Sequence, residues 1–455
     1  NNPLENDLNR IQQWNADHPD QPKKYYRQHV IAWHGSEQNA AFYHMGFDTS
    51  KPLATKEIMN ARLDSYIEAM FKRYQPWDDI IMSWDIVNEA LDDYNGMVRN
   101  GWNGSSWGET SLDDASSQSS AWGTIYRMKD ENGNPVMEKS DERLLYESEW
   151  IRVAFASARK WQKELGVHWK LYYNDYMNSS MLYEPKMTNT LKILKPISEA
   201  GNLDGYGMQA RLSTAYPTIE MLRNQIEEGL KLAPEVSFSE ADVRTDFEVN
   251  PLFDPEKPTK RVTSGVEEWD QGGSGSYNRR SQQNGNTYDV SNGPVRRKAD
   301  FNANDPETMR IQADYYADLM DIMVEKGAEG KVGAIAIDGT SDSNTFNGGT
   351  GCQIWDNSGN EKPAFYAVIG APNRFKMGQA IEAGPADSEE ASYTADSWAV
   401  YAAAKDAAEA LVDVRIYDAE GVEAVKKATA DLNAAIEALE RTLVDIDFDV
   451  DVDAY

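Results

Sequence analysis

The sequence has almost no cysteine, few basic residues and no long apolar run, and each shortage excludes a class of protein. The single cysteine, Cys352, excludes an internal disulfide. Only 45 residues are Lys or Arg, against 75 that are Asp or Glu, and the formal net charge of −30 argues against nucleic acid or an anionic membrane as partner. No run reaches the roughly 20 apolar residues of a membrane-spanning helix. The composition therefore favours a protein that binds an uncharged ligand.

The length and aromatic content of the chain indicate a large folded core. A chain of 455 residues is long enough for one large domain and a smaller one. Its 13 Trp and 23 Tyr residues could serve as stacking platforms for sugars or as ordinary core residues, and composition does not separate the two. No spacing of His, Cys, Asp or Glu is typical of a metal site, so neither a metal nor a cofactor is expected.

Short apolar runs separated by helical segments predict a parallel sheet covered by helices. The runs that predict strands are 29–34, 80–87, 169–174, 205–212, 236–243 and 332–338. The apolar spacing over 56–74 and 147–165 is typical of amphipathic helices. Strands that are apolar throughout and alternate with helices predict either a doubly wound sheet or a (β/α)8 barrel.

Polar residues end each of these runs, which favours the barrel. They are His34, Asn88 with Glu89, Asn174 with Asp175, Gln209, Glu240 and Asp338. In an open α/β sheet the binding site lies at one crevice, whereas in a barrel all strand ends contribute to one site. Six polar strand ends therefore indicate a barrel with its site at the carboxyl end.

Two of these residues, Glu89 and Glu240, form a candidate catalytic pair. A protonated carboxyl group and an ionised carboxylate on opposite sides of a cleft can cleave a glycosidic bond. The buried amide of Asn88 could bind a sugar hydroxyl without adding charge. The alternative is that both glutamates are ordinary carboxylates at the rim of the barrel.

Six ordered sequence blocks make the interpretation specific. They are AWHGSEQ, FDTSKPLATKEIMNARLDSYIEAMFKRY, WDIVNEALDD, LYYNDYMN, DGYGMQARL and SFSEADV. In this order they resemble the family 10 glycoside hydrolases, the endo-1,4-β-xylanases. The resemblance implies a (β/α)8 barrel, a retaining mechanism with carboxyl groups about 5–5.5 Å apart, and β-1,4-xylan or xylo-oligosaccharide as substrate.

The resemblance also implies a role for individual residues. Glu89 would be the general acid/base after strand four, Glu240 the nucleophile after strand seven, and Asn88 the partner of the 2-hydroxyl of the −1 sugar. The other residues that it places at the cleft or in support of it are His29, Trp33, His34, Asn174, Tyr176, Gln209 and Asp242.

Three residues depart from the pattern of the family. Arg211 stands where the family has a His that bonds the nucleophile, and a permanent cation there would hold Glu240 ionised but could also restrain its attack. Asp242 could pair with this arginine. Asp338 and Phe346 replace two tryptophans of the family's eighth-strand block, which would open the −1 region and add negative charge. Turnover and substrate choice are the properties that these changes would affect.

The beginning of the barrel also departs from the family pattern. The family has two strands before the block HVIAWH, whereas a single helix, about Leu4 to Trp14, precedes it here. A parallel barrel without two strands has open edges. We therefore expect strands one and two to come from a second polypeptide or from a segment outside this chain.

The composition divides the chain into further parts. Residues 1–376 are expected to form the barrel from strand three onward, 377–392 a linker, 393–444 a small helical bundle and 445–455 an acidic tail. The bundle resembles three-helix modules of extracellular carbohydrate enzymes. Residues 94–142 and 254–304, rich in Gly, Ser, Asn and Asp, predict loops at the rim of the cleft, with disorder as the alternative.

The main interpretation is a secreted, retaining endo-β-1,4-xylanase that hydrolyses internal bonds of xylan. One alternative is a xylan-binding protein with impaired catalysis, and another is a structural component of an extracellular carbohydrate-degrading assembly. The presence of Asn88, Glu89, Glu240 and Asp242 favours the enzyme, because loss of activity usually begins at the catalytic pair.

Overall fold

The computed structural model describes residues 3–34, 39–92, 95–102, 119–176, 184–249, 260–263, 266–269 and 295–442. Two compact units make up the chain. The first comprises Asn1–Asn302 with Glu329–Gln353, and the second comprises Ala303–Ala328 with Ile354–Tyr455. The first unit holds the sheet and the candidate site, and each unit is described by itself.

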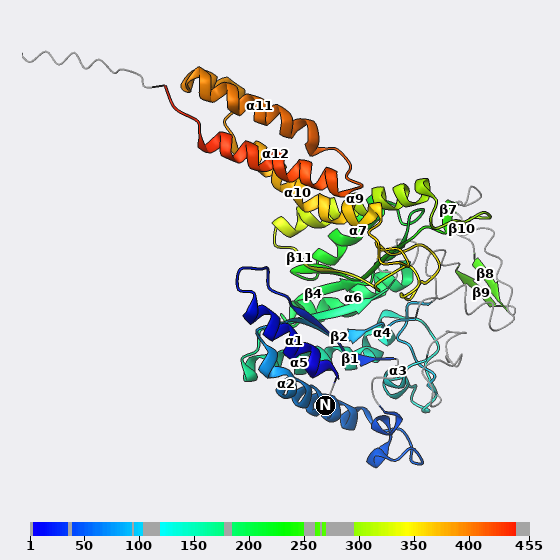
Figure 1. Cartoon of the computed structure of the whole chain (residues 1–455). Helices are drawn as coiled ribbons and strands as arrows, with labels where there is room; N and C mark the ends of the chain where they lie inside the picture. The colour runs from blue at the N-terminus through cyan, green and yellow to red at the C-terminus, as the bar shows by residue number, and fades with distance from the viewer. Residues whose placement is uncertain are drawn as a thin grey trace, which may run out of the picture. The chain divides into compact units, whose positions relative to one another are not determined.

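A parallel sheet forms the centre of the first unit, and its strands are those that the sequence predicts. The order across the sheet is β1-β2-β3-β4-β6-β11, and each neighbouring pair runs parallel (Figure 1). The bounds are β1 Tyr26–Trp33, β2 Ile81–Asn88, β3 Lys170–Asp175, β4 Gly205–Met208, β6 Glu235–Arg244 and β11 Val332–Ile337.

The predicted run 205–212 forms two strands rather than one. Strand β4 ends at Met208, and β5, Arg211–Ser213, begins after Ala210. The φ angle of Ala210 is 59°, in the left-handed region, which interrupts the extended backbone. The chain therefore turns at this point, and β5 pairs with the carboxyl-terminal part of β6. Gln209 and Arg211 both lie near this turn.

The sheet is open, with β1 and β11 at its two ends. In the part of the chain that the structure describes, no strand pairs with the outer edge of either one. All residues of β11, the apolar sequence VGAIAI, are only partly buried. This arrangement is the (β/α)8 barrel from its third strand onward, as the sequence predicts, and apolar surface lines the opening.

The helices of the first unit have ends and buried faces that follow from local sequence. Helix α2, Lys56–Tyr74, begins after Thr55, whose hydroxyl accepts a hydrogen bond from the Ile58 amide. Helix α5, Glu149–Leu165, ends at Gly166 with a φ angle of 68°. The other helices are α1 Pro3–Asp17, α3 Ala121–Ile125, α4 Asp141–Glu147, α6 Glu184–Glu199 and α7 Ile219–Leu230.

Short strands and the long predicted loops complete the first unit. The strand pairs are β7 Phe247–Val249 with β10 Val295–Arg297, and β8 Lys260–Thr263 with β9 Val266–Trp269. The predicted loop 94–142 contains α3 and the start of α4, and its residues 103–118 lie outside the described residues. Most of the predicted loop 254–304 also lies outside them, so its proposed place at the rim stays a prediction.

The second unit is entirely helical where it is described, in agreement with the predicted bundle. Its helices are α9 Pro306–Ala328, α10 Pro363–Ala383, α11 Ala395–Val412 and α12 Ala419–Glu437. Met377 and Ala380 of α10 pack in one cluster with Trp398, Tyr401 and Leu432 of the next two helices.

Helix α10 of the second unit extends into the segment 377–392 that was predicted to be a linker. Residues 377–383 of that segment are the last turns of α10, because their apolar side chains belong to the core of the bundle. The rest of the predicted division into domains stays a prediction, and the acidic tail 445–455 lies outside the described residues. None of the described helices is both long and apolar enough to span a membrane.

The side chain of Tyr172, on β3, packs against β4, β6 and β11, and two of the residues that it touches must be glycine. Its hydroxyl donates to Glu235 and accepts from the Ser237 hydroxyl at 3.0 Å, both on β6. A Cβ atom at Gly205 would overlap the Tyr172 ring, and one at Gly333 would overlap its hydroxyl. The ring therefore fixes the spacing between β3, β4, β6 and β11.

Substitution of Gly205 by Ala tests this packing. We expect Gly205→Ala to lower the free energy of unfolding by about 1–3 kcal/mol, the usual cost of an overpacked core, as measured by urea unfolding. Gly327→Ala is the matched control, because a Cβ there meets no atom within 4 Å. Its effect should stay within about 1 kcal/mol. Equal effects of the two changes would contradict the packing role of Tyr172.

Candidate active site

The two candidate glutamates lie at the carboxyl side of the parallel sheet. Glu89 directly follows β2, and its φ angle of 50° turns the chain out of the strand. Glu240 lies in the second half of β6. The strand register places Trp33, Asn88 and Asn174 side by side on β1, β2 and β3. Residues far apart in the sequence therefore meet at one edge of the sheet.

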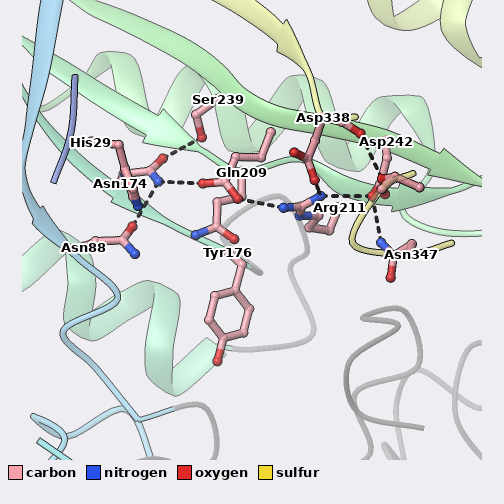
Figure 2. Close-up of polar contacts among 12 residues, drawn as sticks. His29, Asn88, Asn174, Tyr176, Gln209, Arg211, Ser239, Asp242, Asp338 and Asn347 are labelled. Atoms are coloured by element: carbon pink, nitrogen blue, oxygen red, sulfur yellow. Dashed lines mark hydrogen bonds and ion pairs between the residues drawn. The ribbon is translucent and has the colours of Figure 1, made fainter. Parts of the chain in front are cut away.

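Asn174 contacts both glutamates. Its main-chain oxygen accepts from the Glu89 amide at 3.0 Å. Its side-chain Nδ2 donates to Glu240 Oε1 at 3.2 Å and to Asn88 Oδ1 at 2.9 Å, while its Oδ1 accepts from the Ser239 hydroxyl at 2.6 Å. Figure 2 shows the side-chain contacts of Asn174 with Asn88 and Ser239. They orient Asn174 and thereby set the position of Glu240 relative to Asn88.

Gln209 also forms a hydrogen bond with each of the two glutamates. Its Nε2 donates to Glu89 Oε1 at 2.6 Å, and its main-chain oxygen accepts from the Glu240 amide at 3.1 Å. Together with Asn174, it forms a double connection between the ends of β2 and β6. This connection fixes the two carboxylates relative to each other before any ligand binds.

The surroundings of the two glutamates differ in charge. The second oxygen of Glu89, Oε2, accepts from the indole N–H of Trp33 at 2.9 Å and lies 3.7 Å from His34 Nδ1. Glu240 Oε2 instead accepts from the guanidinium of Arg211 at 2.7 Å. A carboxyl group that gives up a proton and a carboxylate that attacks require such different surroundings.

Arg211 is the centre of a cluster of acidic side chains. Its NH1 group donates to Asp242 Oδ2 at 3.1 Å and also to Asp338, and its guanidinium lies 5.0 Å from the centre of the Phe346 ring. The predicted pairing with Asp242 is thus confirmed, and Asp338 joins it. Asn347 donates to Asp242 at 2.7 Å. Burial raises the pKa of Asp242 to about 6, although Arg211 opposes the shift.

His29 is held by an acidic partner rather than by either glutamate. Its Nδ1 lies 2.7 Å from Asp85 Oδ2, and Asp85 also pairs with Arg27. Burial alone would lower the pKa of His29, but the hydrogen bond and the charge of Asp85 outweigh it and raise that pKa. Asp85 was not predicted as a site residue, although an acid inside the apolar run IIMSWDIVN is a signal that could have identified it.

Tyr176 is attached to the site through Arg99, a residue that the sequence analysis missed. Arg99 NH2 donates to the Tyr176 hydroxyl at 2.8 Å, and its Nε donates to the main-chain oxygen of Glu89 at 3.1 Å. Arg99 lies in a segment without periodicity, so no sequence pattern pointed to it. Lys186 was also missed, and it forms an ion pair of 2.8 Å with the buried Asp175.

The structure brings most of the predicted site residues together. Trp33, His34 and Gln209 surround Glu89, whereas Asn174 and Arg211 contact Glu240. Within the described ranges, no group of three or more His, Cys, Asp or Glu side chains is arranged to hold a metal ion.

A family model and several curated proteins are similar to this chain. The family model for glycosyl hydrolase family 10 matches residues 13–371. A putative endo-1,4-beta-xylanase from Caldicellulosiruptor saccharolyticus is 23% identical over 358 residues, which cover 76% of this chain and 83% of the relative. Endo-1,4-beta-xylanase A of the same organism is 27% identical over 234 residues, which cover 50% of this chain and 53% of that protein. The chain thus spans only about half the length of the second relative.

A solved structure supports the fold. Native xylanase 10C from Cellvibrio japonicus has a TM-score of 0.53 with this chain at 19% identity, and the match covers 82% of this chain and 60% of that one. At this identity the likeness concerns the arrangement of strands and helices alone.

The titration of Asp175 should be visible in the stability of the protein. Burial raises the pKa of Asp175 from 3.8 to about 6, against the opposing charge of Lys186. The folded state therefore binds this proton more tightly than the unfolded state, so the contribution of Asp175 to stability is greatest below pH 4 and declines as the pH rises to about 6. In urea unfolding, the stability of wild type minus that of Asp175→Asn should fall between pH 4 and 7. A difference that rises over this range would contradict the shift.

Proposed function

Because the chain belongs to glycosyl hydrolase family 10, we propose that it is a retaining endo-1,4-β-xylanase that hydrolyses internal bonds of xylan. The observation that carries this proposal is the pair of glutamates connected through Asn174 and Gln209, one among neutral donors and one beside a cation. Its xylanase relatives and its high negative charge, which suits a neutral polysaccharide, support the choice of substrate.

The proposed reaction has two steps. In the first, Glu240 attacks the anomeric carbon while Glu89 donates a proton to the leaving oxygen, and a covalent glycosyl-enzyme forms. In the second, Glu89 removes a proton from water, which attacks the same carbon and releases Glu240. Trp33 and Gln209 donate to the two oxygens of Glu89. In the proposed reaction, Asn88, whose Oδ1 accepts from Asn174, binds the sugar hydroxyl next to the reacting carbon.

The alternative function is a xylan-binding protein with impaired catalysis. The observation in its favour is the ion pair between Arg211 and Glu240, which could restrain the attack of the carboxylate. The presence of both glutamates in the connected arrangement favours the enzyme. Release of reducing sugar from xylan, compared with mannan and cellulose, decides between the two, and binding without release supports the alternative.

Substitution of the nucleophile tests the reaction directly. We expect Glu240→Gln to lower kcat on xylan by about 1,000-fold or more, because the amide cannot form the covalent intermediate. The control is Glu131→Gln, the same change at an exposed glutamate, which should leave kcat unchanged. Substantial activity in Glu240→Gln would show that another residue is the nucleophile.

Substitution of Glu89 should have a different effect that depends on the leaving group. Glu89→Gln should lose most activity on xylan, whose leaving oxygen needs a proton. The variant should still form the glycosyl-enzyme from an aryl xylobioside with an acidic phenol, which departs without one. Added azide should then speed turnover and yield a β-xylobiosyl azide, whose mass is measured by mass spectrometry and whose anomeric configuration is measured by proton NMR. An azide product of inverted configuration would contradict the retaining mechanism.

We further propose that two strands from a second polypeptide, or from a segment outside residues 1–455, close the sheet between β1 and β11. Both edge strands run parallel to their neighbours, and the apolar β11 is only partly buried. An open edge of this kind is a template for further strands, and closure removes it.

The proposal of added strands is tested by comparing the isolated chain with material from the native source. In the isolated chain, the amides of β1 and β11 should exchange with deuterium faster than those of the central β3. In native material they should be protected, and mass spectrometry should find the additional polypeptide segment. Equal protection in both samples, with no additional segment, would contradict the proposal.

The proposed substrate also suggests an extracellular location. Intact xylan is too large to enter a cell, so an enzyme that cuts its internal bonds would act outside. Immunoblots of culture supernatant and washed cells would test this part of the proposal, and a signal confined to the cells would contradict it.

A further inference from the structure

The guanidinium of Arg211 donates hydrogen bonds to three carboxylates. One of its terminal nitrogens, NH2, donates to Glu240 Oε2 at 2.7 Å, whereas the other, NH1, donates to Asp242 Oδ2 at 3.1 Å and to Asp338. Figure 2 shows the contacts of Arg211 with Asp338 and Asp242 as dashed lines. The single positive charge is thus divided between the candidate nucleophile on one side and two aspartates on the other.

Asp338 is fixed in place by its own backbone. Its amide donates to the main-chain oxygen of Ala241 at 3.1 Å, next to Glu240 on β6. Its main-chain oxygen accepts from the Thr345 hydroxyl at 2.9 Å and from the Gln353 side chain. These bonds hold the backbone of Asp338, which limits how far its carboxylate can follow Arg211, and we call this carboxylate the anchor of the arginine.

The anchor determines how many hydrogen bonds Arg211 gives to Glu240. A guanidinium and a carboxylate favour a bidentate arrangement with two parallel N–H···O bonds, which is stronger than a single bond. Here NH1 is occupied by Asp242 and Asp338, so only NH2 reaches Glu240. The other oxygen of Glu240 accepts only the neutral Asn174 amide among the hydrogen bonds of the described residues.

We propose that Asp338 is a positioning residue that acts through Arg211 and keeps the contact between Arg211 and Glu240 monodentate, so that one oxygen of Glu240 stays available for attack. This inference rests on the proposed function. It gives a role to two departures from the family pattern, Arg211 and Asp338, because Asp338, together with Asp242, draws the NH1 group of the arginine away from the nucleophile.

The exposure of the side chains agrees with this role. The side chain of Asp242 is fully buried, whereas those of Glu240 and Asp338 are 22% and 33% exposed. Both of these carboxylates are therefore accessible to solvent, whereas the side chain of Arg211, at 11%, is mostly buried. The Phe346 ring lies 5.0 Å from the guanidinium, within the range of a cation–π contact.

Removal of the Asp338 charge should affect the chemical step more than binding. We expect Asp338→Asn to lower kcat on xylan about tenfold, which corresponds to about 1.4 kcal/mol in the barrier, with KM changed less than twofold. The rate at which a 2-fluoro-xylobioside traps Glu240, followed by intact-protein mass spectrometry, should fall by the same factor. Asp338→Glu, which keeps the charge, should recover part of both rates.

A double-mutant cycle tests whether Asp338 acts through Arg211. In the background of Arg211→Met, the further change Asp338→Asn should alter the trapping rate less than twofold, because there is no guanidinium left to hold. The control is Glu361→Gln, the same loss of charge at an exposed residue beyond β11, which should have no effect in either background. Effects that simply add in the cycle would overturn the proposal.

A structural readout separates this inference from the proposed function. In a crystal structure of Asp338→Asn, Arg211 should rotate to form two hydrogen bonds with Glu240, and Asn174 should lose its bond to Oε1. An unchanged monodentate contact would overturn the positioning role whatever the activity. Absence of hydrolysis by wild type on xylan, mannan and cellulose would instead refute the proposed function, and the rotation of Arg211 would still decide the inference.

Discussion

The active-site geometry depends on the double connection between Glu89 and Glu240. Asn174 uses its main chain for one glutamate and its side chain for the other, and Gln209 does the same in the opposite sense. Such an exchange is possible because the strands are parallel and their carboxyl ends lie at one edge. The sheet therefore does not merely carry two acids. Its hydrogen bonds fix the direction of both side chains, which a preorganised site requires.

The second constraint is electrostatic. A buried carboxylate is unfavourable unless a partner compensates it, and the site contains more acids than cations. Arg211 compensates three of them, and burial raises the pKa of Asp242 to about 6 because compensation there is incomplete. Lys186 and Asp175 form a comparable pair on the side of Glu89. The acidic groups near Glu240 and those near Glu89 are thus compensated by different cations, Arg211 and Lys186. Separate compensation suits a pair of carboxyl groups with opposite roles.

The two edge strands of the sheet, β1 and β11, lead directly into residues of the site. Strand β1 ends at Trp33, which contacts Glu89. Strand β11 is followed directly by Asp338, which contacts Arg211. The position of these strands affects both halves of the site. A strand added at either edge would therefore stabilise catalytic geometry as well as the fold.

The sequence by itself determined most of the elements and the candidate site of this protein. Apolar runs, helical spacing and polar strand ends are local properties, so the six strands, the helical bundle and the set of polar strand ends could be predicted from them. The resemblance of six sequence blocks to a known family then singled out Glu89 and Glu240 among these polar residues. The boundaries were less certain, since the left-handed Ala210 divides one predicted strand and α10 continues to Ala383 in the bundle core.

Only the tertiary structure decided which side chains meet. The contacts of Arg99 with Glu89 and of Arg211 with Asp338 join segments with no shared periodicity, and they depend on strand register and loop path. A shift of one residue along a strand would point a different side chain at each partner. The sequence could therefore name the two candidate catalytic glutamates, but the hydrogen bonds that orient them follow from long-range packing alone.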